Sequence, residues 1–591
     1  MSTAPPTAPR DRRLSLVTVL ALLLVLTLVA AWQRRWTADD AFINFRAVRN
    51  ILDGDGPVFN AGERVEVGTS PLWLWLLAGT DAVLPFDIGW IAVALGALLS
   101  GAGVLLAALG AMRLEPSPAN GLRPARAFLP VGALAFLAVP ATWDFLTSGL
   151  ETGLTFGWLG LLWWGVARQA GSQAPTRPRW LSLVVGLGPL VRPDLALVSV
   201  CLGSWYLVAV PSGWWRRVAD VGVAVAVPVG YQVFRMGWFG LLVPNTAVAK
   251  ESTRAVWDRG WAYLGDLVGT YQLVVPLVLC AALLVVTARA RRWSPRVLGL
   301  VVVTVCTAVL HALFVVRVGG DFMHARLLLP ALFLVLCPVA VIPVPAWRRG
   351  RTAAVLAGAL VCGVAAWAAV CATVMRIDYP ASFTVAGISD ERGFYAAAAG
   401  TAHPVSLADH GHTGLTAVAD QVQTSFDAGR GEVFLQDTVV ATPAGVRLLP
   451  VGRADGGTVF RVSQAGYLGF AVSDDVQVID TYGLTDVLGS HLEPGAPGRA
   501  GHEKPVPIVW FWAQYAEGLP DAARNPSYGS VSPSGLNDAH AALSCGRLAE
   551  LVEATSAPMD LGRFWDNLTG ATARTSLRVP QDPGVARDAF C

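Results

Sequence analysis

The chain has 591 residues, of which 54% are hydrophobic and only 15% are charged, and its mean hydropathy is +0.51. A soluble domain carries roughly 25% charged residues, so this composition excludes an ordinary soluble enzyme. Lys and Arg together number 44, and Asp and Glu number 42. This balance argues against a nucleic-acid-binding protein, which presents a basic face. The chain is therefore expected to act in or at a membrane.

Apolar runs follow one another from the N-terminus to residue 374. A helix needs about 20 apolar residues to span roughly 30 Å of hydrocarbon. The first run, Leu14 to Trp32, follows an arginine-rich segment and lacks a small-residue cleavage site, which predicts an anchor rather than a removed signal peptide. Further runs lie at 71–86, 88–112, 127–146, 153–167, 180–191, 195–211, 218–234, 271–288, 297–316, 327–346 and 352–374.

Arginines fill several connections between these runs, and arginine collects in cytoplasmic loops. The run at 71–86 is short, begins at Pro71 and contains Asp81, so we predict a juxtamembrane or re-entrant helix on the outer face over Pro71–Leu84. About eleven crossings then place every arginine-rich connection inside and the C-terminus outside. The thinnest span, 180–191, is a candidate for a broken helix that depends on its neighbours.

The hydrophobic runs stop at Met375, and the remainder has the length of one soluble domain. Short β-rich segments punctuated by Gly, Pro and Asp predict a sheet-based module, with a helical stretch at 538–554. Cys545 and Cys591 lie in this region, where an oxidising compartment would allow a disulfide. The predicted β-rich segments are 431–442, 446–451, 457–462, 466–472 and 476–480.

We therefore predict an integral membrane α-helical protein with three parts. Residues 1–13 form a disordered cytoplasmic tail, 14–375 form the transmembrane domain with an outer loop at 34–87, and 376–591 form an extracytoplasmic β-rich domain. The topology sorts most polar residues that flank the apolar runs to the outer side. Ionisable groups at membrane depth cost about 2.5–3.5 kcal/mol each and mark functional positions, so we predict a site that faces away from the cytosol.

The adjacent Asp39 and Asp40 follow the first run and point to different sides of any helix or strand. They suggest one general base and one orienting group, although one of them can instead cap the helix predicted after them. Lys250 and Arg326 suit a phosphate, Lys as a point charge and Arg as a two-pronged donor; the alternative is a cation that snorkels to the interface. His324 is either a general acid or phosphate donor, or an interfacial polar residue.

Glu151 and Asp194 have two interpretations as well, as substrate contacts or as ion-pair partners of Arg192. The sequence contains no Cys-x-x-Cys pair and no His/Cys spacing typical of a metal site. We therefore predict no metal ligands and no obligatory cofactor, although a pair of acids can recruit a divalent cation.

Several different short motifs follow one another along the predicted outer face. They are Thr37–Ile43, Val58–Asn60, Gly62–Glu66, Thr69–Trp73, Ser148–Thr152, Arg192–Asp194, Pro244–Thr246 with Lys250, Gly319–Met323, Gly466–Gly469, Ile479–Leu484 and Gly501–Lys504. In this order they resemble the GT-C glycosyltransferases, integral membrane enzymes that take sugars from polyprenyl phosphate carriers. More narrowly, they resemble the terminal β-(1→2)-arabinofuranosyltransferases (AftB type) of arabinogalactan-building actinobacteria.

This resemblance implies a GT-C fold, a decaprenyl-phosphate arabinose donor, an arabinan chain end as acceptor, and a C-terminal carbohydrate-binding module. Asp39 or Asp40 would take the proton of the acceptor hydroxyl. The donor phosphate would be bound by Lys250, Arg326 and His324, and the sugars by Glu66, Glu151, Arg192, Asp194, Asn245 and Asp321. The bilayer is then a partner, nucleic acid is not, and the site lies on the extracytoplasmic side of the plasma membrane.

The stereochemistry leaves two mechanisms open. If donor and product are both β-linked, the configuration at the anomeric carbon is retained. Retention requires either a carboxylate nucleophile, as in glycosidases whose two carboxyl groups lie about 5–5.5 Å apart, or entry of the acceptor on the leaving-group face.

Other functions are compatible with parts of this pattern. One is a GT-C transferase that uses a polyprenyl-phosphate hexose of the mannose type. Another is a transporter or flippase of lipid-linked saccharides, which predicts ionisable residues near the middle of several spans and inverted repeats, whereas here the spans carry almost no charge. A structural or sensor protein would not need Asp39 and Asp40.

Overall fold

The computed structural model describes residues 10–114, 127–251, 254–344, 351–378, 384, 386–411, 414–435, 457–495, 498–516 and 531–591. The chain divides into two compact units, each built from three separate stretches. Unit 1 comprises Met1–Arg35, Val93–Pro228 and Ala255–Pro380, and unit 2 comprises Trp36–Ala92, Val229–Arg254 and Ala381–Cys591. The predicted outer loop thus belongs to the same unit as the C-terminal region.

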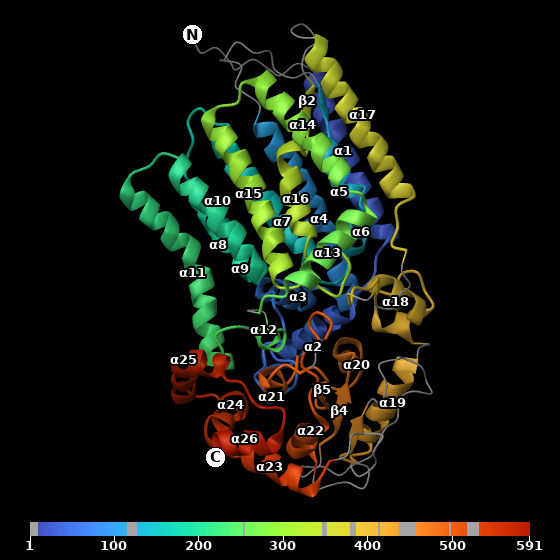
Figure 1. Cartoon of the computed structure of the whole chain (residues 1–591), viewed down its shortest axis with the longest axis vertical. Coiled ribbons are helices and arrows are strands. Elements are labelled where there is room, and N and C mark those ends of the chain that lie inside the picture. The colour runs from blue at the N-terminus through green and yellow to red at the C-terminus, as the bar shows by residue number, and fades with distance from the viewer. Residues whose placement is uncertain are drawn as a thin grey trace. The chain divides into compact units, whose positions relative to one another are not determined.

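Six helices in the described part of the chain are long and apolar enough to cross a membrane. They are α1 (Arg10–Gln33), α4 (Ile88–Arg113), α11 (Trp214–Phe239), α14 (Val274–Arg291), α15 (Pro295–Arg317) and α17 (Arg351–Thr373). Within unit 1, α14 and α17 lie side by side (Figure 1). Helix α1 begins at Arg10, so the last residues of the predicted tail are helical.

Of the other predicted crossings, 153–167 forms a single helix of 19 residues, whereas single helices over 127–146 and 327–346 are wrong. Prolines interrupt both runs, because proline lacks the N–H that a helix interior needs. The first run forms β1 (Ala127–Leu129), α5 (Val131–Leu137) and α6 (Pro140–Phe145); the second forms α16 (Leu329–Leu336), η3 (Cys337–Val339) and β2 (Ile342–Val344). Strands β1 and β2 pair antiparallel, with Phe128 opposite Pro343.

The thin run at 180–191 is broken, as predicted. It forms α8 (Arg179–Gly186) and α9 (Gly188–Val191), and the next run forms η2 (Pro193–Leu195) and α10 (Ala196–Ala209). Helices α7 (Thr152–Ala170) and α13 (Trp257–Thr270) complete unit 1.

In unit 2, α3 (Pro71–Asp81) has 11 residues, too few to cross a bilayer. Six long helices therefore match predicted crossings, and the count of about eleven remains a prediction.

Glycines let α4 and α7 approach each other closely in unit 1. A Cβ added at Gly103 would lie 2.3 Å from the carbonyl oxygen of Phe156, and one added at Gly160 would lie 2.4 Å from that of Gly103. One added at Gly153 would lie 2.6 Å from the Gly96 carbonyl oxygen. Small residues of this kind allow membrane helices to pack backbone to backbone. The contact also fixes the start of α7, which follows directly after Glu151.

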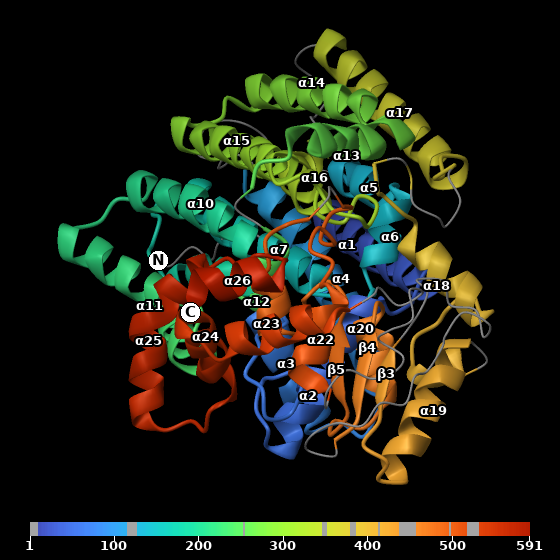
Figure 2. The same ribbon diagram turned by 60° about the horizontal axis from the view of Figure 1, so that its bottom comes forward.

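Unit 2 contains a small parallel sheet with the order β3-β4-β5 (Figure 2). Its strands are β3 (Val433–Leu435), β4 (Val459–Val462) and β5 (Gln477–Asp480). Predicted strands at 457–462 and 476–480 are confirmed, and 446–451 lies outside the described residues. The strand predicted at 466–472 is wrong, because α20 (Ala465–Ala471) occupies it and packs its aromatic side chains against α2 (Asp39–Asp53).

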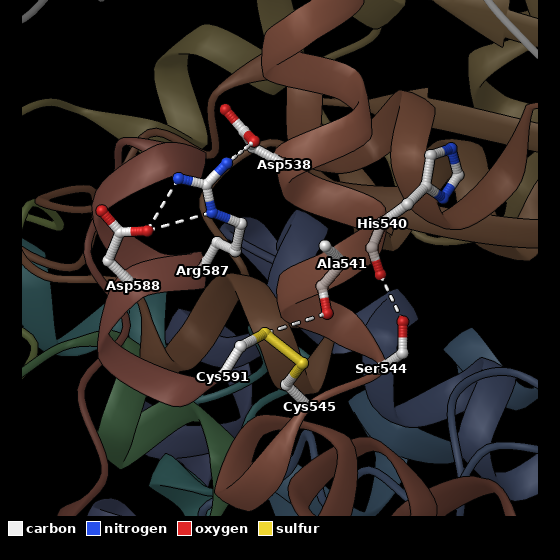
Figure 3. The surroundings of a disulfide bond; sticks show 8 residues. All are labelled: Asp538, His540, Ala541, Ser544, Cys545, Arg587, Asp588 and Cys591. Atoms are coloured by element: carbon white, nitrogen blue, oxygen red, sulfur yellow. Dashed lines mark hydrogen bonds and ion pairs between the residues drawn. A yellow bond between two sulfur atoms is a disulfide. The ribbon is translucent and has the colours of Figure 1, made fainter.

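The predicted β-rich domain is instead a mixed module in which helices predominate among the described residues. These helices are α18 (Glu391–Ala399), η4 (Leu407–His410), α19 (Gly414–Asp427), α21 (Val487–His491), α22 (Ile508–Tyr515), α23 (Pro533–Leu543), α24 (Gly546–Ser556), α25 (Leu561–Ser576) and α26 (Pro583–Phe590). The helix predicted over 538–554 is divided between α23 and α24. Cys545 and Cys591 form a disulfide beside the Arg587 ion pairs with Asp538 and Asp588 (Figure 3).

Arg46 ties α2 to the C-terminal stretch of unit 2. Its side chain is 0% exposed and donates hydrogen bonds to the carbonyls of Phe59, Gly469, Ser473, Asp474 and Val476. A buried guanidinium is costly unless its donors are satisfied, so these five carbonyls fix the helix in place.

Candidate functional site

The two units divide the predicted site residues between them. Unit 2 holds Asp39, Asp40, Glu66, Asn245 and Lys250, and unit 1 holds Glu151, Arg192, Asp194, Asp321, His324 and Arg326. Within each unit, the structure brings several of these residues together. Their convergence into a single cavity remains a prediction.

Ion pairs connect Glu151 to two arginines in unit 1. Arg192 binds Asp194 through Nε and Nη2 at 3.0 and 3.1 Å, and its Nε lies 3.8 Å from Glu151. Arg326 lies 3.5 Å from Glu151 and 3.5 Å from Asp321. Buried charges are tolerated when they are paired, so Glu151 and Asp194 do serve as ion-pair partners. Among the described residues, Nη1 of Arg192 has no hydrogen-bond partner.

His311 joins this network from α15, and the sequence reasoning missed it. The side chain is 1% exposed, and its Nε2 lies 2.7 Å from the Asp194 carboxylate. Its Nδ1 has no hydrogen-bond partner in the described part of the chain. The available signal was a lone polar residue inside the apolar run 297–316, since ionisable groups in spans usually have a specific partner.

His324 is held from both ring nitrogens. Nδ1 contacts the carboxylate of Asp266 on α13, and Nε2 lies 3.1 Å from the hydroxyl of Tyr271. The side chain is 4% exposed. A carboxylate at one nitrogen orients the ring and sets the tautomer, so the His324 ring is held in a fixed orientation.

Asp39 in unit 2 connects α2 to α20. Its two carboxylate oxygens accept hydrogen bonds from the backbone N–H groups of Tyr467 (2.7 Å) and Gly466 (3.2 Å). It therefore caps the first turn of α20, and the predicted cap on its own helix is wrong, because the N-cap of α2 is Ala38 without a side-chain bond. Burial, together with the neighbouring charge of Asp40, raises the pKa of Asp39 to about 7. The hydrogen bonds from the two N–H groups act in the opposite direction and lower this pKa.

Asp40 has different neighbours from Asp39, as expected for adjacent helical residues. Burial lowers the pKa of the Arg499 guanidinium, and the carboxylate of Asp40 acts in the opposite direction. Burial raises the pKa of Tyr395 well above its usual value, and Asp40 is among the acids that add to this shift. Asp40 thus lies within electrostatic range of a cation and a phenol of the same unit, while staying half-buried.

The sequence contains two lysines, and they have opposite environments. Lys504 is 0% exposed, donates hydrogen bonds to two backbone carbonyls and forms an ion pair with Glu251. Lys250 is half-buried and makes no hydrogen bond or ion pair with any residue that the structure describes. Its Nζ would lie 3.5 Å from a Cβ at Gly501. A half-buried ammonium without a protein anion is suited to an anionic ligand.

Residues near Lys250 extend this environment: Tyr482 and His502 belong to the quoted motifs, and Arg499 belongs to none of them. The ring of His502 packs edge-on against Tyr482 at 4.6 Å. Burial lowers the pKa of His502 well below its usual value, and the charges of Arg499 and Lys250 contribute. Arg499 also lies within electrostatic range of Tyr482.

Glu66 and Asn245 are engaged by the protein itself. Glu66 binds Arg235 at 2.6 and 3.1 Å and accepts a hydrogen bond from Tyr231 at 2.8 Å. Asn245 is the first residue of α12 (Asn245–Ala249). Its side-chain amide donates hydrogen bonds to loop carbonyls at 483–486 and accepts one from the hydroxyl of Ser490 at 2.7 Å. These contacts suit positioning roles, because few of their polar atoms remain for a sugar.

Comparison with known proteins identifies the family. Residues 455–589 match the AftB family C-terminal domain. The chain is 36% identical to the terminal β-(1→2)-arabinofuranosyltransferase of Mycobacterium tuberculosis, over 97% of this chain and 96% of the relative. It is 31% identical to that of Corynebacterium glutamicum, over 94% of this chain and 84% of the relative. No solved structure matches. The chain therefore belongs to the terminal β-(1→2)-arabinofuranosyltransferase family.

Proposed function

We propose that the chain transfers arabinofuranose from decaprenyl-phosphate arabinose to the non-reducing ends of cell-wall arabinan, forming terminal β-(1→2) linkages. The observation that carries this proposal is the near full-length similarity to two relatives named for that linkage. Six apolar helices suit an enzyme whose donor is a lipid. The choice of decaprenyl phosphate as carrier rests on the resemblance to GT-C enzymes.

In this reaction Asp40 is the general base and Asp39 is its positioning neighbour. Both oxygens of Asp39 already accept hydrogen bonds from α20, which gives it a structural task. Asp40 keeps partial exposure and lies within electrostatic range of Arg499. A base must reach the acceptor hydroxyl directly or through one water. Both acids are half-buried, and the structural task of Asp39 leaves this role to Asp40.

Lys250 is the residue that binds the donor phosphate. Arg326 is shared between two carboxylates, so much of its charge is already neutralised, whereas Lys250 has no protein anion among the described residues. Charge on the phosphate grows as the bond to the sugar breaks, and a nearby cation stabilises that transition state. Arg192, His311 and the acids around them then maintain the polar interior of unit 1.

The site and the C-terminal region face the extracytoplasmic side in this proposal. The arginine-rich connections support this orientation, because arginine collects in cytoplasmic loops. The disulfide between Cys545 and Cys591 supports it as well, since disulfides persist in oxidising compartments.

The test uses the purified chain in lipid nanodiscs, synthetic decaprenyl-phosphate arabinose and a short arabinan acceptor. Asp40→Asn should lower kcat roughly 100-fold or more, the range expected for loss of a general base. Asp53→Asn, at the exposed end of the same helix, is the matched control and should leave kcat unchanged. Full activity of Asp40→Asn would remove the assigned base. Transfer from decaprenyl-phosphate mannose alone would replace arabinose by a hexose as the donor sugar.

A further inference from the structure

Helix α25 carries an apolar stripe outside every predicted membrane span. Leu561, Phe564, Trp565 and Leu568 recur at the spacing that places them on one face of a helix. Leu561 is 82% exposed and Trp565 is 61% exposed. Single exposed apolar residues are ordinary, but two large ones on adjacent turns form a patch that calls for a partner.

The stripe is fixed beside the C-terminal end of α11, within unit 2. A Cβ at Gly237 would lie 2.2 Å from the ring of Phe564, so the ring packs directly on the backbone there. Arg574 donates to the carbonyl of Gly240 at 3.0 Å, and the N–H of Leu242 donates to a side chain of α25 at 2.7 Å. Figures 1 and 2 both show α25 beside this end of α11.

The neighbouring surface of α11 is suited to lipid. Only 6% of the apolar 18-residue stretch of this helix is buried inside the protein. Val229 and Val233 are 55% and 43% exposed. They lie at four-residue spacing on the same face of α11 as Gly237, where the ring of Phe564 packs. The helix has 26 residues, about 39 Å at 1.5 Å per residue, which exceeds the roughly 30 Å of hydrocarbon. Its end therefore extends into the interfacial layer.

We propose that the α25 apolar stripe inserts into the headgroup and acyl-chain boundary of the bilayer and docks this part of unit 2 on the membrane. Tryptophan is enriched at that depth because its ring is amphipathic. The occupant is lipid because the stripe continues the lipid-facing side of a membrane helix.

The charges around the stripe define which lipid property matters. Arg563 forms an ion pair with Glu553, Asp560 caps the helix, and Asp566 is exposed. No surplus of basic residues adjoins the stripe in the described part of α24 and α25, so anionic headgroups would gain little. Docking should therefore depend on apolar insertion and be insensitive to salt.

The experiment places a nitroxide spin label on full-length protein in nanodiscs of neutral phosphatidylcholine. The exposed native cysteines Cys306 and Cys362 are first replaced by serine. Labels then enter as Trp565→Cys, Leu561→Cys or, as the matched control on an exposed polar position of the same helix away from the stripe, Asp566→Cys. Electron paramagnetic resonance measures the accessibility of each label to oxygen, which partitions into lipid, and to a nickel chelate, which stays in water.

The labels at 561 and 565 should be more accessible to oxygen than to nickel, and the label at 566 should show the reverse. High salt should leave both results unchanged. Nickel accessibility at 565 equal to that at 566 would overturn the proposal. So would a label inaccessible to both reagents, which would indicate a protein partner. Retained thermal stability of each labelled variant confirms that the fold is intact.

Discussion

Asp39 illustrates how one residue can couple protonation to folding in unit 2. Burial raises its pKa from the usual 3.8 to about 7, so the folded protein holds a proton that the unfolded chain releases. The stability contributed by this group is fully present below pH 3.8 and is lost as the pH rises through about 7. Burial raises the pKa of Asp480 to about 6, which acts in the same direction.

We therefore predict that Asp39→Asn weakens the fall in melting temperature between pH 4 and pH 7, because it removes a titrating carboxyl group. Thermal unfolding of purified protein across this pH range measures the effect. The same fall in wild type and variant would show that Asp39 does not titrate there. Asp53→Asn, at an exposed position of α2, controls for the loss of an acid.

The two lysines give a second prediction at the residue scale. Lys250→Met should raise KM for the lipid-linked donor roughly 10- to 100-fold, the equivalent of about 1.5–3 kcal/mol for a hydrogen bond to a charged group, with little change in melting temperature. Lys504→Met should instead lower the melting temperature, because it removes a buried donor from two carbonyls and one of the two cations that pair with Glu251. Steady-state kinetics and thermal unfolding separate the two roles. Equal loss of stability in both variants would contradict the assignment.

At the scale of elements, the glycine contact between α4 and α7 sets how near the two backbones lie. Gly103→Ala would place a methyl group 2.3 Å from the carbonyl oxygen of Phe156, which neither helix can accept without moving. We expect a loss of about 1–3 kcal/mol, typical of overpacking, seen as a lower melting temperature. Gly222→Ala on α11, where no atom lies within 4 Å, is the matched control. Unchanged stability at Gly103 would show that the helices separate without cost.

Prediction from sequence succeeded where an element depends on its own residues. The six long helices follow from the length and mean hydropathy of their apolar runs, and Lys250 stood out because lysine is rare in this chain. It failed at 127–146 and 327–346, where we gave more weight to the apolar composition than to the prolines that break the helices. It also failed at α20, whose first turn is capped by a residue more than 400 positions earlier. Arg499 and His502 were missed as site residues for the same reason, because their neighbours come from distant stretches of the chain.

At the scale of the whole molecule, unit 2 is assembled from stretches far apart in sequence. Arg46 supplies donors to carbonyls at 469–476, and Asn245 does so at 483–486. A fragment comprising 376–591 alone would leave these carbonyls to water and expose the face of α20 that packs on α2. We predict that it unfolds without a cooperative thermal transition, measured by circular dichroism. A sharp transition with the Cys545–Cys591 disulfide intact would show that the region folds independently.

The scarcity of lysine has a practical consequence for following the donor. Reagents that acylate primary amines reach exposed or half-buried ammonium groups, and Lys504 is enclosed. Apart from the terminal amine, the chain thus offers a single modifiable nitrogen, on Lys250. Mass spectrometry of acylated peptides would then report donor binding, because a phosphate bound at Lys250, as proposed, would shield this amine. The protein in effect carries its own footprinting probe at the position where the lipid-linked sugar is expected to bind.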